Sequence, residues 1–117
     1  PLDRISIDYA LMEKADRIAM IEALFSWDDV GDWPALARHF KADPNGNVVV
    51  GKDAVVLNAE RNILVSTPGH LTALLGVKDL VVVRSRGATL ICARDRAQDV
   101  KKLVQKLEQE GRHQRLL

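Results

Sequence analysis

The sequence lacks several features that would place it in a specialised class. It has one cysteine, Cys92, so no intramolecular disulfide can form, which suits a reducing compartment. Seventeen basic residues stand against sixteen acidic ones, and the net charge of +1 gives no long-range field for nucleic acid. No apolar run approaches the length of a membrane span, and no signal-peptide pattern opens the chain. We therefore expect a cytoplasmic protein without nucleic-acid or membrane partners.

Features of known binding sites are equally scarce. No glycine-rich phosphate loop lies between a strand and a helix, and the three histidines share no spacing typical of metal ligands. Aromatic residues make up only 4% of the chain, so Trp27 and Trp33 stand out. The hydrophobic content of 47% over 117 residues is enough for one domain with a real core.

The first forty residues predict mixed structure. Residues 6–14 have helical spacing, with Ser6 as the N-cap. Residues 18–21 and 23–25 are apolar and predict one or two strands. Asp32 is placed to cap a second helix, whose apolar positions 33, 36, 37 and 40 share one face. Together these elements predict an α/β unit through about residue 41, ended by the turn cluster at residues 43–47.

The middle of the chain predicts strands almost throughout. Short apolar runs recur every eight to ten residues, separated by polar or glycine-bearing turns, which is typical of a sandwich, a barrel or a small β-helix. No strict six-residue repeat is present, which argues against a long regular β-helix. The predicted strands are 48–50, 54–57, 63–65, 71–75, 80–83 and 89–92.

The last segment predicts one helix over residues 96–110. Asp95 and Gln98 have the spacing of a capping box, and Gly111 stands where a helix ends. The apolar stripe predicts that the helix docks on the sheet, with Val100, Val104 and Leu107 buried.

One acidic stretch is the candidate for chemistry. Residues 25–33 read FSWDDVGDW, in which Asp28, Asp29 and Asp32 surround Gly31. Carboxylates that follow a strand can hold Mg²⁺ together with phosphate oxygens of a substrate. Turns rich in aspartate are common without any metal, however, and the residues alone favour a solvated turn with a helix cap. Only 24 residues precede this stretch, so we expect one edge of an active site rather than a whole one.

Several runs together resemble one enzyme family. SIDYALMEK at 6–14, the FSWDDVGDW stretch and DRAQDVKK at 95–102 occur in the order seen in the carboxyl-terminal third of bacterial mannose-1-phosphate guanylyltransferases. NVVVG at 47–51 and GVKDLVVV at 76–83 are similar to the same family, so the resemblance extends over nearly the whole chain.

The resemblance implies an α+β fold in two parts. Residues 1–45 would be the end of a Rossmann-like nucleotidyltransferase domain, and residues 46–117 a small left-handed β-helix-like module closed by a terminal helix. The parent would join GTP and mannose 1-phosphate, and its missing amino-terminal domain would carry the nucleotide loop. Asp29 would be one of two carboxylates on Mg²⁺. The resemblance further implies substrate contacts from Asp8, Glu13, Lys14, Trp27 and Gly31.

Some positions depart from the family pattern, and other functions stay open. Ser26, Asp28 and Asp32 stand where the family usually has glycine, serine and serine, and RSRG at 84–87 replaces a more typical turn. That turn belongs to the accessory module, so the departure bears on packing or subunit contacts rather than on chemistry. The alternatives are a non-catalytic assembly module that forms a homo-oligomer, and a parent enzyme that uses another nucleotide or sugar.

Overall fold

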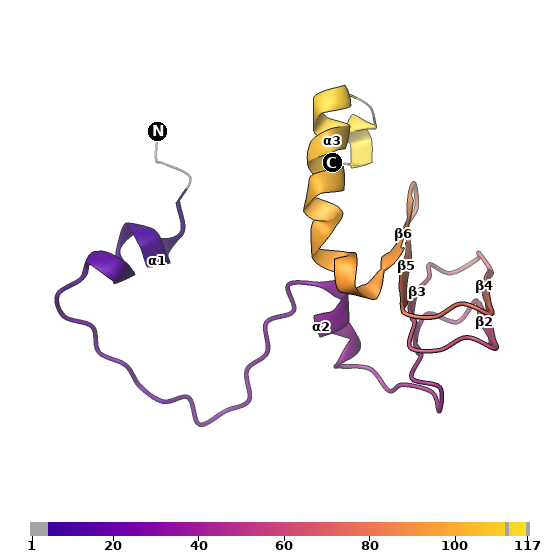
Figure 1. The fold of residues 1–117 in the computed structure, drawn as a ribbon, viewed down its shortest axis with the longest axis horizontal. Coiled ribbons are helices and arrows are strands. Elements are labelled where there is room, and N and C mark those ends of the chain that lie inside the picture. Colours follow the sequence, from indigo (N-terminus) through magenta and orange to yellow (C-terminus); the bar gives the residue numbers. More distant parts are fainter. Residues whose placement is uncertain (1–4, 112, 117) are drawn as a thin grey trace.

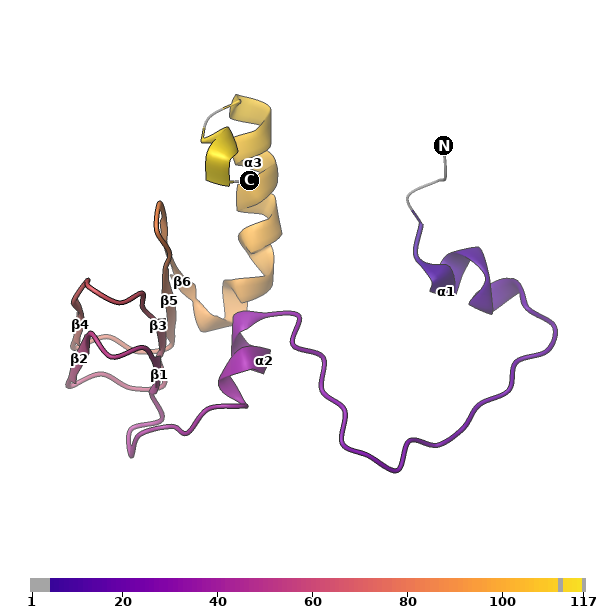
Figure 2. The ribbon, with the colours of Figure 1, turned by 180° about the vertical axis from the view of Figure 1, so that it is seen from behind.

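A computed structural model describes residues 5–111 and 113–116 of the chain. An extended amino-terminal arm, residues 5–31, leads into a β-rich body that holds the remaining elements (Figure 1). The radius of gyration is 18.7 Å, against about 13 Å for a compact chain of this length. The arm accounts for the difference, because it extends away from the body in both ribbon views (Figure 2).

The arm contains the first predicted helix but none of the predicted strands. The helix is short: α1 spans Ile7–Ala10 and the 3₁₀ turn η1 spans Met12–Lys14, while the side chain of Ser6 forms no capping hydrogen bond. Residues 18–21 and 23–25 are extended but unpaired, and Met20, Ile21 and Leu24 are each more than 90% exposed. A strand needs a neighbouring strand to satisfy its backbone, and no described strand lies beside the arm. The expectation of strands at residues 18–21 and 23–25 is therefore wrong for this structure.

All six strands predicted in the middle of the chain are present, with bounds within one or two residues. They form a four-stranded sheet in the order β1-β3-β5-β6 and a two-stranded sheet, β2-β4. Pairing is parallel except between β5 and β6, which form a hairpin. The bounds are β1 Val48–Val50, β2 Ala54–Leu57, β3 Ile63–Val65, β4 Thr72–Leu75, β5 Leu80–Arg84 and β6 Thr89–Ala93.

The parallel strands stack as turns of a coil. The register advances from Val48 to Ile63, which is 15 residues, and from Ile63 to Val81, which is 18 residues. The second sheet forms another side of the same coil, and a parallel bridge between Glu60 and Lys78 marks a third side. This mixed-sheet coil is the β-helix-like architecture that the resemblance implies.

The inner strands of the larger sheet, β3 and β5, are buried on both faces. Leu64 and Val82 face the interior of the coil, where they pack with Ala59 and Leu74 from its other sides. Val48, Ile63 and Val81 face outward and pack against Ala37 and Ala97 from the flanking helical segments. Burial on both faces explains why these strands read as continuous apolar runs instead of alternating patterns.

Two stacked asparagines hold one corner of the coil. Asn47 and Asn62 are both almost completely buried, and the Oδ1 of Asn47 accepts hydrogen bonds from the backbone N and the Nδ2 of Asn62, each at 3.0 Å. The Nδ2 of Asn62 also donates to the carbonyl of Val77, and its Oδ1 accepts from the N of Leu80. These side chains satisfy backbone groups that the corner removes from the strand ladders. No local pattern in the sequence indicates this ladder.

Gly51 is required where two turns of the coil come close together. Its φ is +122°, and an added Cβ would lie 2.5 Å from the Oγ of Ser66 and 2.7 Å from its carbonyl oxygen. We expect Gly51→Ala to lower the free energy of unfolding by more than about 2 kcal/mol, since it adds a backbone clash to an unfavourable φ. Gly69→Ala is the matched control: its φ is +81° with open space around it, so only about 1 kcal/mol should be lost. Equal losses in urea titrations would contradict the close approach.

The carboxyl-terminal helix starts later and packs less than predicted. A 3₁₀ segment, η2 Arg94–Asp99, precedes α3 Val100–Glu110, and the expected capping box is absent because Asp95 and Gln98 lie within η2. Gly111 ends α3 in the left-handed conformation (φ 62°), as predicted.

The expected burial of the α3 stripe is wrong for this structure. Val100 and Leu107 are partly buried, Leu103 and Val104 remain 48% and 38% exposed, and no α3 residue is fully buried. The stripe stays exposed because η2 makes the contacts with β5 and β6, while α3 projects beyond the sheet (Figure 1).

Candidate functional site

The junction between the arm and the body is fixed by Asp32. Its Oδ1 accepts a hydrogen bond of 2.7 Å from the N of Ala35, which confirms the predicted cap of α2 Trp33–Ala37. Its Oδ2 lies 3.4 Å from the Nε2 of Gln98 on η2. The helix is shorter than its apolar pattern suggested, because it ends before Phe40, which is 42% exposed. Asp32 therefore anchors the acidic stretch to the β-rich body.

Asp28 is engaged by Arg38 and His39. One oxygen lies 2.5 Å from the Nη2 of Arg38, while the other accepts from the Nε of Arg38 at 3.1 Å and lies 3.0 Å from the Nε2 of His39. The hydrogen bonds from Arg38 hold the pKa of the Asp28 carboxyl below its usual value. The sequence gives no signal for either partner, because separations of ten and eleven residues follow no local helix or strand rule.

Asp29 is the one aspartate of the stretch whose carboxylate is not engaged. It forms no hydrogen bond or ion pair with any other described residue, and it is exposed. Both carboxylate oxygens lie 3.5 Å from the point where a side chain on Gly31 would begin, so the carboxylate lies over the glycine. A groove of about 540 Å³ opens beside them between the acidic stretch and the start of α3, with Arg38 and Lys101 in its lining. Asp29 thus faces an open groove whose lining includes two cationic side chains, Arg38 and Lys101.

The donor set of this chain fits one part of a magnesium site. Mg²⁺ is commonly bound by one or two carboxylates, with water and substrate phosphate oxygens completing its octahedron. Among the described residues no three histidine, cysteine, aspartate or glutamate side chains gather closely enough to hold a metal ion. Asp29 can supply one carboxylate, whereas Asp28 and Asp32 are held by Arg38 and by the cap of α2.

The other residues predicted for the site lie at different places along the arm. Gly31 lies directly beside Asp29. Trp27 is 75% exposed on the arm, close to them in the sequence. Asp8 on α1 and Glu13 and Lys14 on η1 lie at the far end of the arm, where the ribbon views place them away from the acidic stretch (Figures 1 and 2). The structure therefore brings Asp29 and Gly31 together but not the other three polar residues.

Trp33 and Cys92 pack against the hydrophobic core. Trp33 is partly buried against the cluster that contains Ile63 and Val81, whereas Trp27 makes no such contribution. Cys92 packs against the same cluster, and burial raises the pKa of its thiol, which disfavours the reactive thiolate.

Comparison with known proteins shows which proteins the chain resembles. Residues 52–107 match the family model described as the MannoseP isomerase/GMP-like beta-helix domain. The alginate biosynthesis protein AlgA of Pseudomonas aeruginosa is 40% identical over 107 residues, and a mannose-1-phosphate guanylyltransferase of Salmonella montevideo is 41% identical over 111 residues. These alignments cover 92% and 95% of this chain but 22% and 23% of the relatives. The chain is similar to the carboxyl-terminal part of mannose-1-phosphate guanylyltransferases.

A solved structure shows the same similarity. The crystal structure of a protein named mannose-1-phosphate geranyltransferase, from Thermus thermophilus, superposes with a TM-score of 0.74 at 42% sequence identity. The match covers 92% of this chain and 32% of that protein. The chain thus spans about a fifth of the length of the curated guanylyltransferase relatives that it matches. No helix in the described ranges 5–111 and 113–116 is long and apolar enough to cross a membrane.

Proposed function

We propose that the full-length protein carrying this chain is a cytoplasmic mannose-1-phosphate guanylyltransferase that joins GTP and mannose 1-phosphate into GDP-mannose and pyrophosphate. The observation that carries the proposal is the alignment over more than nine tenths of the chain with proteins of that name, at about 40% identity. The free Asp29 carboxylate beside an open groove supports it, because nucleotidyl transfer needs a divalent cation held near phosphate groups.

Within this proposal each aspartate of the acidic stretch has a separate task. Asp32 caps α2 and contacts Gln98, which fixes the stretch to the body. Asp28 engages Arg38 and His39. Asp29 would hold Mg²⁺ together with a second carboxylate from outside this chain, and the ion supplies positive charge beside the phosphate that is transferred. Gly31 lies beside the carboxylate of Asp29.

The exposed arm has a place in the same proposal. Met20, Ile21 and Leu24 are each more than 90% exposed, and Phe25 is 71% exposed. A contiguous apolar segment of this kind is costly in water and indicates a surface that is covered in the functional protein. We assign the arm to the nucleotidyltransferase domain, where its extended residues would pair with strands and where Asp8, Glu13 and Lys14 would reach the substrates.

A substrate panel tests the reaction and separates it from the nearest alternative. Full-length protein with Mg²⁺ should form GDP-mannose from GTP and mannose 1-phosphate, and it should prefer this pair over dTTP with glucose 1-phosphate. Product formation followed by mass spectrometry gives the answer. Preference for another nucleotide or sugar would assign the protein to a related nucleotidyltransferase class. No transfer with any pair would leave only an assembly role, for which the half-exposed α3 stripe is the relevant surface.

The 117-residue chain by itself should form no GDP-mannose. Its sequence contains no glycine-rich phosphate loop, and it offers one free carboxylate at the acidic stretch, so neither positioning nor charge stabilisation is complete. The measurement is product formation at high protein concentration, with the full-length protein as the positive control. Turnover by the isolated chain would contradict the proposal that catalysis needs residues outside this chain.

A further inference from the structure

The coil of the β-rich body is open at one end. β1, β3 and β5 stack in three successive turns, but β2 has only β4 above it, because the chain turns back after β5 into the antiparallel strand β6. β4 is therefore the last strand of its sheet. A groove of about 570 Å³ lies at this position, between β4 and the β5–β6 hairpin.

The floor and one rim of this end groove are apolar. Leu74 and Val82, which belong to the interior cluster of the coil, are 8% and 3% exposed and form its base. Leu75 on β4 and Ile91 on β6 remain 67% and 63% exposed at its edges. The groove therefore offers apolar surface that a ligand with an apolar part can cover.

The polar part of the lining consists of side chains that can donate hydrogen bonds. His70, Thr72, Arg84 and Thr89 contribute to it, and the lining contains no carboxylate. The Nε of Arg84 and the Oγ1 of Thr72 are both shielded from solvent and have no hydrogen-bond partner among the described residues. Buried polar groups are normally paired, and an acceptor bound in the groove would pair these two after a small rotation of the side chains.

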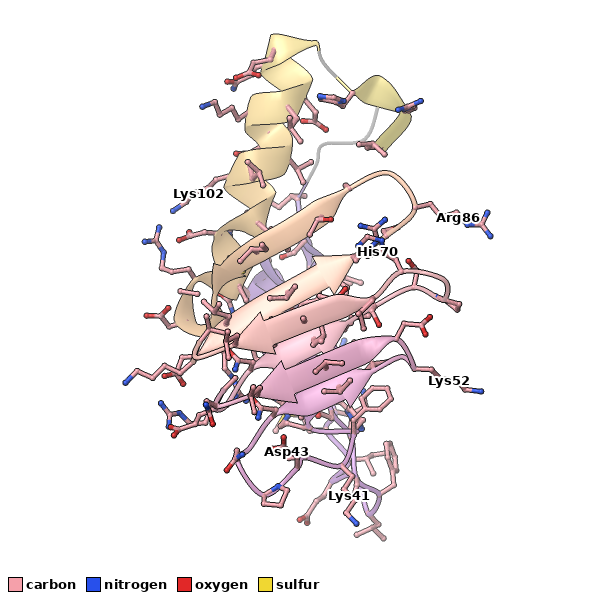
Figure 3. All side chains as sticks on the ribbon, turned by 90° about the vertical axis from the view of Figure 1, so that its right-hand side faces the viewer. Lys41, Asp43, Lys52, His70, Arg86 and Lys102 are labelled. Atoms are coloured by element: carbon pink, nitrogen blue, oxygen red, sulfur yellow. The ribbon has the colours of Figure 1, made fainter. Side chains whose placement is uncertain are left out.

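Local structure holds this polar part in place. Arg84 is the final residue of β5 and pairs in register with Thr89 of β6. The turn before β4 is anchored by Asp53, whose Oδ2 accepts a hydrogen bond of 2.7 Å from the N of Gly69. Figure 3 shows His70, the next residue, beside the hairpin, whereas Arg86 at the hairpin tip points outward into solvent.

We infer that this end groove binds a small phosphate ester. The apolar part of the ligand lies over Leu74 and Val82, and its phosphate accepts hydrogen bonds from Arg84, His70 and Thr72. A phosphate fits better than a carboxylate, since three donor side chains surround the site and phosphate has three terminal oxygens. The RSRG turn, which departs from the family pattern and has no part in the proposed catalysis, then acquires a role because it begins with Arg84. The inference does not depend on the proposed reaction.

Phenyl phosphate is the probe that tests both halves of the site. Titration calorimetry on the full-length protein should show binding of phenyl phosphate that is at least tenfold tighter than binding of inorganic phosphate or of phenol. Arg84→Gln should weaken phenyl phosphate binding at least tenfold. Arg86→Gln is the matched control, because it removes the same charge two residues away, outside the groove, and should change the dissociation constant less than twofold.

Each outcome decides the inference. Equal weakening by the two arginine substitutions would show general charge attraction and overturn the site, as would equal affinity for phenyl phosphate and inorganic phosphate. Absence of phenyl phosphate binding would overturn it as well. Binding of phenyl phosphate at an active site elsewhere in the full-length protein would not depend on Arg84. Arg84→Gln therefore separates the two sites, because it should weaken phenyl phosphate binding and leave the turnover of GTP and mannose 1-phosphate unchanged. Folding is checked by the thermal midpoint, and a variant that does not fold is replaced by Arg84→Lys, which keeps the charge but loses the Nε donor.

Discussion

Replacing Asp29 with asparagine in the full-length enzyme should reduce turnover of GTP and mannose 1-phosphate on the order of 100-fold or more. The substitution keeps the size of the side chain and removes its negative charge. Because Asp29 is exposed and forms no contact that stabilises the described structure, folding should be unaffected. The loss would therefore reflect weaker binding of the metal and less stabilisation of charge in the transition state. Steady-state kinetics at saturating substrates and several Mg²⁺ concentrations measure it.

Asp28→Asn is the matched control for this prediction. The two aspartates are neighbours and the chemical change is the same, but Asp28 is engaged by Arg38 and His39 instead of facing the groove. Loss of an exposed ion pair is a small effect, so turnover should fall less than about tenfold. Similar small losses in both variants would mean that Asp29 is only a turn residue.

Replacing Asn62 with alanine should cause a large loss of stability. The substitution removes three hydrogen bonds made by the buried amide and leaves the N of Leu80, the carbonyl of Val77 and the Oδ1 of Asn47 with fewer partners. Buried polar groups without partners cost about 1–3 kcal/mol each, and the total should be about 3–5 kcal/mol, given partial relaxation. Urea unfolding followed by circular dichroism gives the value.

Asn45→Ala controls for the loss of an asparagine near the same corner. Asn45 is exposed, and its contacts in the turn are made by its backbone, which accepts from the N of Arg61 and donates to Asp43. Its substitution should cost less than about 1 kcal/mol. A comparable loss for both variants would mean that the asparagine ladder does not determine the stability of the coil.

The β-rich body could be predicted from sequence because its strands carry strong local signals. Runs such as 48–50 and 80–83 are continuous, β-branched and bounded by turn residues, and burial on both faces of the sheet preserves that pattern. Asp32 and Gly111 were equally predictable, since a cap depends on residue type and position alone.

The features that could not be predicted depend on contacts between distant residues. The apolar arm has the composition of strands, yet strand formation requires a partner that the described chain does not provide beside it. The α3 stripe has the periodicity of a docked helix, but η2 takes the contacts with the sheet. The asparagine ladder follows from the 15-residue spacing of two coil turns, which no local propensity encodes.

Direct measurement of metal binding tests the central claim that Asp29 is the carboxylate this chain contributes to the metal site. Electron paramagnetic resonance can titrate Mn²⁺, as a substitute for Mg²⁺, into the full-length enzyme in the presence of GTP. The account predicts that Asp29→Asn raises the dissociation constant for Mn²⁺ at least tenfold, while Asp28→Asn changes it less than twofold. Unchanged Mn²⁺ affinity in Asp29→Asn would contradict the account.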